Sequence, residues 1–171
     1  MTRFVCEPLA KHHDRDTFRC GDADLDGYLR HRAGQDVRRR VAAVFVMLPE
    51  DQPRRIAGFY ALASAAIVLD DLPPEIAKNL PRYPVVPAVL LGRLARDAAF
   101  PGLGRLLLLD ALARSLRISQ EVPAAVVLVD AKPEAARRFY SRYGFEGVPG
   151  KPNRMFLPME TVERLLAETP K

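Results

Sequence analysis

The sequence predicts a mixed α/β fold, in which helices flank a sheet that has parallel strands at its centre. Three observations favour this class. A buried strand, a short loop and an amphipathic helix follow one another within Leu90–Leu112. The run Ala124–Val129 is entirely apolar, which is typical of a strand buried on both faces and parallel to its neighbour. Two strongly apolar segments, Val41–Leu48 and Ile56–Leu69, flank a turn and predict an antiparallel hairpin.

The first part of the chain predicts a strand, a loop and one long helix. Arg3–Leu9 is a strand candidate, and the polar stretch Lys11–Arg19 is expected to be a loop. Acidic residues from Asp22 to Asp26 suit the first turn of a helix, where carboxylates accept free backbone N–H groups. Apolar residues at three- and four-residue spacing then continue this helix as far as Arg38–Arg40.

Glycine and proline define several of the later elements. Gly58 in the second hairpin strand marks a bulge or a point of close contact. Asp71 is expected to cap a short helix that reaches Leu80, and prolines keep Arg82–Pro87 extended. Gly144 is expected to end a helix in the left-handed conformation. The remaining elements are a strand over Val89–Arg96, helices over Leu103–Ile118 and Pro133–Tyr143, a strand over Asn153–Pro158 and a helix over Thr161–Ala167.

Composition favours a single folded domain over residues 1–171 in the cytoplasm. The chain has 171 residues, of which 49% are hydrophobic and 27% charged, and neither a signal peptide nor a membrane-spanning run is expected. Cys6 and Cys20 are expected to be reduced thiols, although their number also allows a disulfide. The net charge of +5 suggests a polyanionic partner.

The loop before the helix at Leu103 has the features of an anion site. Gly102 and Gly104 let the backbone approach a ligand closely. The first N–H groups of the helix have no partner within it, and they point outward at the positive end of the helix dipole. We therefore expect this loop to hold a phosphate.

Two further clusters of side chains have alternative interpretations. Arg38–Arg40 either complement a helix C-terminus or, together with Lys11, Arg30 and Arg32, form a phosphate-binding surface. The adjacent His12 and His13 have no third histidine or cysteine at ligand spacing, so we expect surface imidazoles and no metal site.

Four segments, in this order, resemble the GNAT family of acyltransferases. They are the strand segment Leu91–Ala95, the loop Gly102–Arg105, the buried strand Ala124–Val129 and the Phe-Tyr…Gly-Phe helix segment Ala136–Phe145. The resemblance implies a mixed sheet in which two parallel central strands splay apart. It also implies that acetyl-CoA binds in the gap as the co-substrate.

A narrower resemblance, to the tRNA-acetylating toxins of type II toxin–antitoxin modules, covers nearly the whole chain. The matching segments are Phe18–Gly21, Leu25–Leu29, Ala33–Asp36, Gly58–Leu62, Pro84–Ala95, Val129–Ala131 and Met155–Pro158. This resemblance implies acetylation of the α-amino group of an aminoacyl-tRNA, which blocks translation. It further implies a ribbon–helix–helix antitoxin that covers the active site, and a homodimer, for which Val85–Val89 is a candidate contact.

The resemblance also assigns roles to individual residues. Tyr140 matches the family tyrosine that protonates the leaving thiolate. A neutral phenol within hydrogen-bond reach of sulfur can serve as a general acid. The residue pattern alone leaves open that Tyr140 packs in the core with Phe139 and Phe145. The residues assigned to acetyl-CoA are Leu94, Ala95 and Arg96 for pantetheine, Gly102, Leu103, Gly104 and Arg105 for pyrophosphate, and Phe139 beside Tyr140.

Basic side chains are the candidates for contact with tRNA, because they neutralise backbone phosphates. The candidates are Arg38, Arg39, Arg40, Arg82, Arg93, Arg137, Arg142, Lys151 and Arg154. For Arg93, a surface charge at a strand end is an equal alternative.

Two departures from the family pattern keep other functions open. The stretch Ala98–Pro101 is shorter than the family loop, and Arg96 stands where a small apolar residue is usual. Both favour a catalytically weakened module that binds the antitoxin. A GNAT enzyme for a small amine or a protein N-terminus is a further alternative, although such a substrate does not require the arginine clusters.

Overall fold

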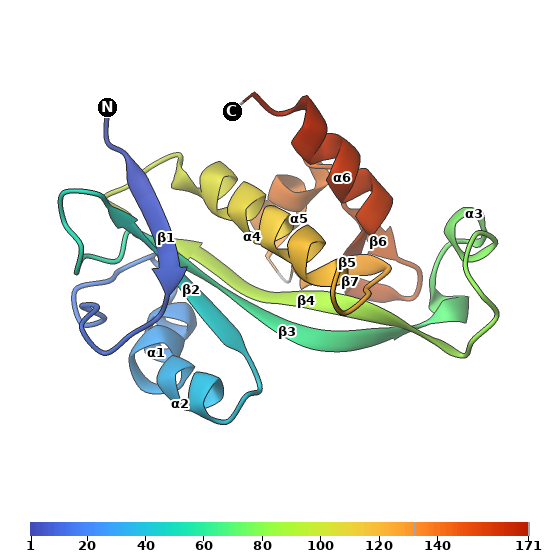
Figure 1. Ribbon diagram of the computed structural model, residues 1–171, viewed down its shortest axis with the longest axis horizontal. Helices are drawn as coiled ribbons and strands as arrows, with labels where there is room; N and C mark the ends of the chain where they lie inside the picture. The colour runs from blue at the N-terminus through green and yellow to red at the C-terminus, as the bar shows by residue number, and fades with distance from the viewer. Residues whose placement is uncertain (132, 171) are drawn as a thin grey trace. The chain divides into compact units, whose positions relative to one another are not determined.

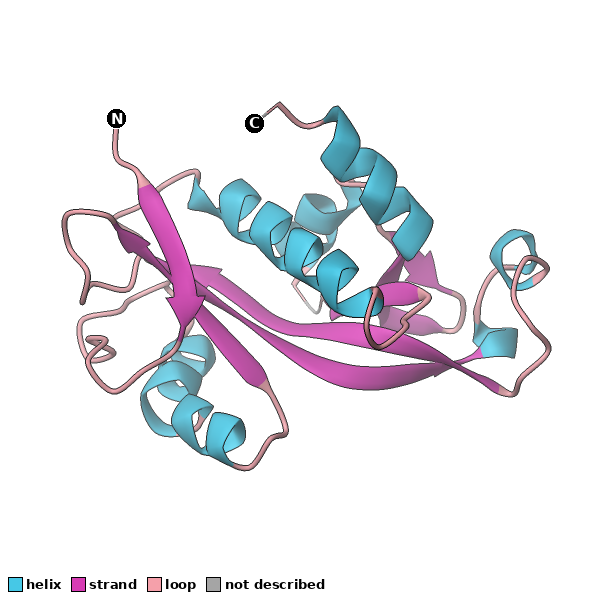
Figure 2. Cartoon of the chain, viewed as in Figure 1, coloured by secondary structure: helices cyan, strands magenta, loops and turns pink. Residues whose placement is uncertain are grey.

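The computed structural model describes residues 1–131 and 133–170 as a mixed α/β fold with a seven-stranded sheet (Figures 1 and 2). The strand order is β1-β2-β3-β4-β5-β7-β6. The strands are β1 (Phe4–Pro8), β2 (Ala43–Pro49), β3 (Gly58–Val68), β4 (Val85–Arg96), β5 (Val126–Asp130), β6 (Glu146–Val148) and β7 (Lys151–Pro158). The helices are α1 (Ala23–His31), α2 (Ala33–Arg38), the 3-10 turn η1 (Leu69–Asp71), α3 (Pro74–Ala77), α4 (Leu103–Ser119), α5 (Glu134–Ser141) and α6 (Met159–Glu168).

The parallel pair predicted for the centre of the sheet is present. β4 pairs with β5 in parallel, from Ala88 opposite Val126 to Leu91 opposite Val129. This register ends at Leu91, whereas β4 continues to Arg96. The predicted hairpin of β2 and β3 is antiparallel, as are β1 with β2 and β5 with β7.

The chain divides into two compact units. Unit 1 comprises Met1–Ala63 and Gly92–Ala111, and unit 2 comprises Ser64–Leu91 and Leu112–Lys171. The long strands β3 and β4 each contribute residues to both units. That residues 1–171 act as a single domain stays a prediction.

Unit 1 has an aromatic core on one face of its strands. Phe59 on β3 packs edge-on against Phe18, with ring centroids 5.5 Å apart, and lies parallel to the ring of Tyr28 on α1. The preceding residue, Gly58, faces α4 instead, because successive strand residues point to opposite faces. Helices α1 and α2 therefore cover one face of these strands, and the first half of α4 covers the other (Figure 1).

The single helix predicted to run from Asp22 to Arg40 is wrong in one respect. It breaks at Arg32, whose backbone (φ −122°, ψ −31°) separates α1 from α2. The apolar face continues through the break, since Tyr28, Leu29 and Ala33 all enter the same core. The predicted cap is confirmed, because Asp22 accepts hydrogen bonds from the N–H groups of the first turn of α1.

Unit 2 has a second core, made largely of aliphatic side chains of β4 and β5 with Phe156 of β7. One prediction is wrong here, one strand was not predicted, and the candidate dimer contact is only partly exposed. Asp71 ends the turn η1 and does not cap α3, whose N-cap is Pro73. Strand β6, which pairs with β7, was not predicted. The Val85–Val89 stretch exposes Val85 but buries Val86 and Val89, because alternate strand residues face the core.

Two expectations from composition can be compared with the described residues. None of the described helices is long and apolar enough to cross a membrane. Cys6 and Cys20 are free thiols, as expected. The pKa of the Cys20 thiol is raised to about 11, mainly by burial and secondly by a hydrogen bond with Asp26.

Candidate active site

The loop between β4 and α4 (residues 97–102) has the backbone geometry of an anion site. Gly102 adopts a φ of +84°, in the left-handed region that favours glycine, and the space where a Cβ would stand is open. Helix α4 starts at the next residue, Leu103. By helix geometry the N–H groups of Gly104 and Arg105 have no partner within the helix, so they are available to a phosphate oxygen.

This loop is anchored by Asp97, a buried carboxylate that the sequence did not single out. One carboxylate oxygen accepts the N–H of Arg19 at 2.9 Å, and the other accepts the N–H of Ala99 at 2.8 Å. The Asp97 N–H donates to the carbonyl of Ala57, and the Ala98 N–H donates to that of Arg19. The N-terminal segment and β3 therefore fix the start of the loop.

The end of β4 presents the residues predicted to hold pantetheine. Ala95 is buried, and its carbonyl lies close to Gly58, 3.1 Å from where a Cβ would stand. Arg96 is exposed, and its guanidinium reaches the backbone carbonyl of Asp97 at 3.5 Å. The Arg96 side chain thus extends along the start of the loop.

Tyr140 lies on α5 in unit 2 and is mostly buried. Its ring contacts Phe139 and Phe145, with centroids 5.2 and 5.3 Å away. Burial raises the pKa of the phenol well above its ordinary value. Tyr140 is therefore both a packed aromatic residue and a neutral O–H that stays protonated at physiological pH.

Arg93 on β4 packs against a buried tyrosine. Its guanidinium carbon lies 3.7 Å from the centroid of the Tyr28 ring, a cation–π contact, and that of Arg32 lies 5.6 Å from it. The Tyr28 hydroxyl donates to Asp36 at 2.9 Å. Burial and this hydrogen bond raise the pKa of Tyr28 to about 12, although Arg93 opposes the shift. Tyr28 thus supports a guanidinium at the predicted substrate position.

The other tRNA candidates of unit 1 lie at the end of α2. Arg38 is the last residue of the helix, and Arg39 and Arg40 follow it; all three are exposed. Arg40 has a φ of +60°, which reverses the chain after the helix.

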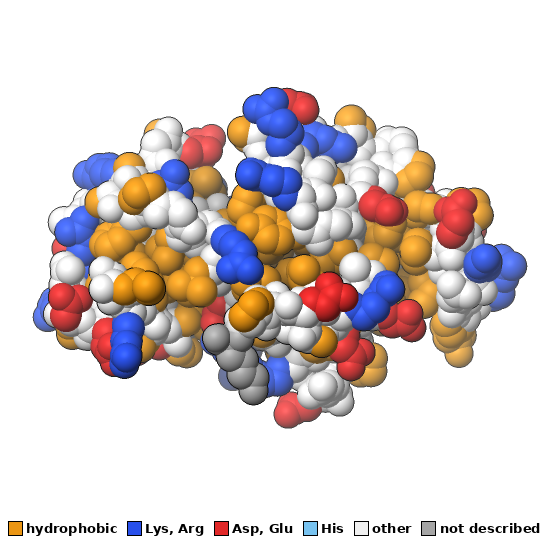
Figure 3. Space-filling model, turned by 90° about the horizontal axis from the view of Figure 1, so that it is seen from above, with side chains coloured by type: hydrophobic (Ala, Val, Ile, Leu, Met, Phe, Trp, Pro, Cys, Tyr) orange, Lys and Arg blue, Asp and Glu red, His pale blue; other side chains and the backbone are white. Residues whose placement is uncertain are grey.

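The candidates of unit 2 are partly committed to local contacts. Arg154 pairs with Asp130 at 3.0 Å, Lys151 with Asp71 at 3.9 Å, and Arg137 donates to the carbonyl of Pro152. Arg142 lies over the ring of Phe139, and Arg82 is exposed. On the face shown in Figure 3 the basic side chains are dispersed among acidic and apolar ones.

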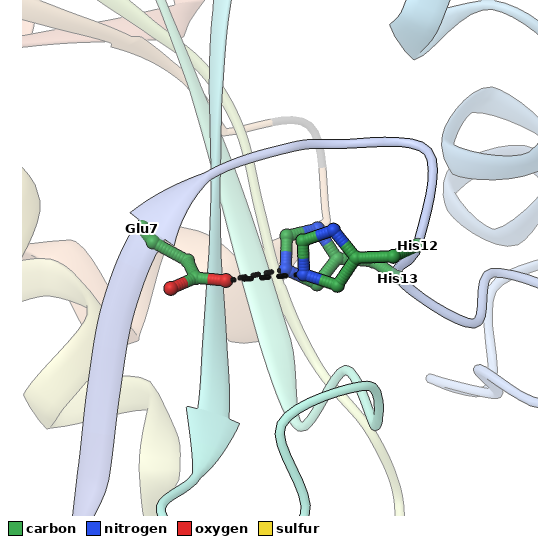
Figure 4. A group of neighbouring side chains, drawn as sticks. All are labelled: Glu7, His12 and His13. Carbon is green, nitrogen blue, oxygen red and sulfur yellow. Dashed lines mark hydrogen bonds and ion pairs between the residues drawn. The ribbon is translucent and has the colours of Figure 1, made fainter.

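Glu7, His12 and His13 cluster beside β1 (Figure 4). The expectation of surface imidazoles is wrong for His13, which is buried. Its Nδ1 accepts the N–H of Ala10 at 2.9 Å, so the proton of the neutral ring lies on Nε2, 2.7 Å from the Glu7 carboxylate. A metal at Nε2 would have to displace that proton, and the arrangement is explained as a structural hydrogen bond.

Two curated relatives match nearly the whole chain. A probable toxin TacT of Sinorhizobium fredii is 34% identical over 172 residues, covering 95% of this chain and 94% of that protein. A tRNA-acetylating toxin of Mycobacterium tuberculosis is 34% identical over 157 residues, covering 91% of this chain and 92% of the relative. The chain belongs to the family of tRNA-acetylating toxins. No model in the scan of family models matches it.

Solved structures of this toxin family confirm the predicted GNAT fold. AtaT in complex with acetyl-methionyl-tRNAfMet superposes with a TM-score of 0.88 at 27% identity, covering 95% of this chain and 99% of that chain. AtaTR bound with AcCoA gives a TM-score of 0.83 at 26% identity, covering 95% of this chain and 97% of that chain.

The sequence alone missed residues whose partners lie far away along the chain. Asp97 directly follows an apolar strand, and an acidic residue at such a position was a usable signal. Asp26, which accepts the N–H of Cys20 at 3.0 Å, was interpreted only as a first-turn residue. No local pattern marked the Glu7–His13 bond.

Proposed function

We propose that the protein is a toxin N-acetyltransferase, which transfers the acetyl group of acetyl-CoA to the α-amino group of an aminoacyl-tRNA and thereby blocks translation. The observation that carries this proposal is the 34% identity to a tRNA-acetylating toxin over 91% of the chain. The structure of AtaT with acetyl-methionyl-tRNAfMet supports the same substrate class.

The residues of the β4–α4 loop fit acetyl-CoA. A pyrophosphate needs free N–H donors and a close backbone approach. Gly104 and Arg105 offer the donors and Gly102 the approach, while Leu103, whose own N–H donates to the Phe100 carbonyl at 3.4 Å, is assigned by its place at the start of α4. We assign the backbone of Leu94, Ala95 and Arg96 to pantetheine. We also assign Phe139 to the binding of acetyl-CoA. Acetyl-CoA supplies the reactive thioester.

Tyr140 is the proposed general acid. The reaction needs a neutral amine as nucleophile and a proton for the thiolate that leaves. The raised pKa keeps the proton on Tyr140 until a strong base forms beside it. No Glu or His is assigned as the base, because the amine of an aminoacyl ester is less basic than that of lysine and water suffices to accept its proton.

The basic residues give the enzyme its affinity for tRNA in this proposal. Arg38, Arg39, Arg40 and Arg93 belong to unit 1, and Arg82, Arg137, Arg142, Lys151 and Arg154 belong to unit 2. The exposed arginines at the end of α2 are the strongest candidates, since the structure gives Arg154, Lys151 and Arg137 local partners.

The proposed partners are a ribbon–helix–helix antitoxin, whose tail covers the active site, and a second copy of the chain. Membership of the toxin family supports an antitoxin. We place the protein in the cytoplasm, where its tRNA substrate is found.

Tyr140→Phe tests the proposal. Acetylation of aminoacyl-tRNA should fall by about 100-fold or more, the usual effect of a general acid, while calorimetry finds unchanged acetyl-CoA affinity. Tyr143→Phe is the matched control, because Tyr143 contacts the same Phe139 ring. Full activity of Tyr140→Phe would remove its catalytic role.

A non-catalytic module is the second candidate, favoured by Arg96 and the short loop. It predicts no acetyl-CoA binding at millimolar concentration and no toxicity of the expressed chain. Micromolar binding with toxicity that Tyr140→Phe abolishes would exclude it.

A further inference from the structure

A basic pocket in unit 1 lies outside the residues assigned above to acetyl-CoA and to catalysis. The loop after β1 meets the β2–β3 turn there, and α1 closes it from one side. A hydrogen bond of 2.8 Å from the Asp14 N–H to the carbonyl of Arg54 joins the loop to the turn. The pocket is open, with a volume of about 860 Å³. Its cationic lining residues are Lys11, Arg15, Arg30, Arg54 and Arg55.

The two carboxylates of the pocket, Asp14 and Asp16, are fewer than its five cations. Asp14 is engaged in its own turn, where it accepts the N–H groups of Asp16 and Thr17 and the Thr17 hydroxyl. In the described part of the chain, none of the five cationic residues forms an ion pair with an acidic side chain. The lining therefore holds a surplus of positive charge.

Arg30 carries the clearest sign of a missing ligand. Its Nε atom is buried and has no hydrogen-bond partner among the described residues. A buried N–H of a charged group is unfavourable unless an acceptor reaches it. Because Arg30 lines the pocket, an anion that enters it would bind the guanidinium and offset this cost.

Gly34 on α2 provides an independent sign. If a Cβ were added there, it would lie 3.0 Å from Nη1 of Arg15 and 3.2 Å from Nη1 of Arg38. Two guanidinium groups therefore converge over a residue that has no side chain. The two positive charges repel each other, and a bridging anion would turn the repulsion into two charge-assisted hydrogen bonds.

We propose that this pocket binds a backbone phosphate of tRNA, held by Arg15 and Arg30 and approached by Arg38. The inference rests on the proposed function and names a subsite for the same substrate. Apart from Pro53 and the imidazole of His13, the lining contains neither aliphatic nor aromatic residues, so a peptide finds few apolar anchors there. An open, cationic surface suits a polyanion that passes through it, and such contacts position the nucleic acid without reading its sequence.

The test measures binding of deacylated tRNA as a function of salt. Arg15→Gln combined with Arg30→Gln should weaken binding by about tenfold or more at low salt, and should reduce the slope of log K against log salt by about one per lost contact. Acetylation of a short 3′-aminoacyl oligonucleotide, which lacks most backbone phosphates, should stay unchanged. Acetyl-CoA affinity should also stay unchanged.

Gly34→Ala excludes an effect through unfolding. Alanine favours a helix more than glycine does, so the melting temperature should not fall, yet the methyl group displaces the two guanidiniums and should weaken tRNA binding. Gly27→Ala is the matched control, because a methyl group there on α1 meets no atom within 4 Å.

The outcomes separate the inference from the proposed function. If the wild-type chain neither binds tRNA nor acetylates aminoacyl-tRNA, the proposed function fails. If the wild-type chain does both and the variants keep its affinity and salt slope, the pocket inference alone is overturned. If the variants bind acetyl-CoA more weakly than the wild type but bind 3′-dephospho-acetyl-CoA equally well, the pocket belongs to the cofactor and the inference is overturned. If the variants lose only the binding of an acidic peptide, the pocket belongs to a protein partner and the inference is likewise overturned.

Discussion

At Gly58 the packing of α4 against β3 leaves no room for a side chain. The position of an added Cβ lies 2.6 Å from a methyl group of Leu107 and 3.1 Å from the Ala95 carbonyl. The sequence predicted a close contact or a bulge here, and the close contact is confirmed. The same closeness brings the end of β4 and the first turns of α4 together in unit 1.

Gly58→Ala should therefore lower the free energy of unfolding by about 1–3 kcal/mol, the usual cost of overpacking. Gly27→Ala should instead raise it by about 0.5–1 kcal/mol, since glycine is unfavourable within a helix. Denaturant unfolding of both variants checks this pair. An unchanged Gly58→Ala protein would mean that Leu107 moves aside freely.

Tyr28 makes stability depend on pH at alkaline values. Its pKa is about 12 in the folded chain, against 10.0 for an ordinary tyrosine. Above pH 10 the unfolded chain loses this proton while the folded chain keeps it, so the free energy of unfolding falls as pH rises from about 10 to 12. Tyr140 contributes a slope of the same sign. Unfolding curves between pH 8 and 11 should show a smaller decline for Tyr28→Phe; an equal decline would contradict the assignment.

At the scale of elements, the β4–α4 loop depends on one carboxylate. Asp97→Ala would leave the N–H groups of Arg19 and Ala99 without their acceptor. We expect the free energy of unfolding to fall by about 1–3 kcal/mol and acetyl-CoA to bind more weakly, as measured by chemical denaturation and calorimetry. Asp97→Asn, which keeps one acceptor oxygen, should be intermediate. Normal acetyl-CoA affinity in a destabilised Asp97→Ala protein would show that the loop is ordered without this anchor.

The sequence predicted most elements because hydrophobic periodicity and capping residues are local signals. It predicted the parallel β4–β5 pair and the start of α4, on which the candidate cofactor residues depend. It failed at Arg32, where the apolar face continues across a backbone break, and at β6, a strand of three residues. The basic pocket combines a loop with a turn some forty residues later, and no periodicity links the two.

At the scale of the whole molecule, the chain has a net charge of +5, and the basic residues proposed to bind tRNA occur in both units. Replacing Arg38–Arg40 with alanine should weaken tRNA binding and flatten its salt dependence, by about 0.9 in slope per lost phosphate contact. Arg137→Ala with Arg142→Ala is the corresponding change in unit 2. Filter binding of tRNA at several salt concentrations compares the two multiple variants. If a variant keeps both the affinity and the salt slope of the wild type, the arginines that it lacks lie outside the interface.

Because of Asp97, two backbone amides that are distant in the sequence should exchange with solvent together. The amide of Arg19 and that of Ala99 are held by the same side chain, so both become open to solvent when the loop detaches. A ligand that orders the loop should slow deuterium uptake at Arg19 as well as at Ala99. Exchange at the N-terminal segment thus becomes a reporter of loop occupancy that needs neither turnover nor a labelled substrate.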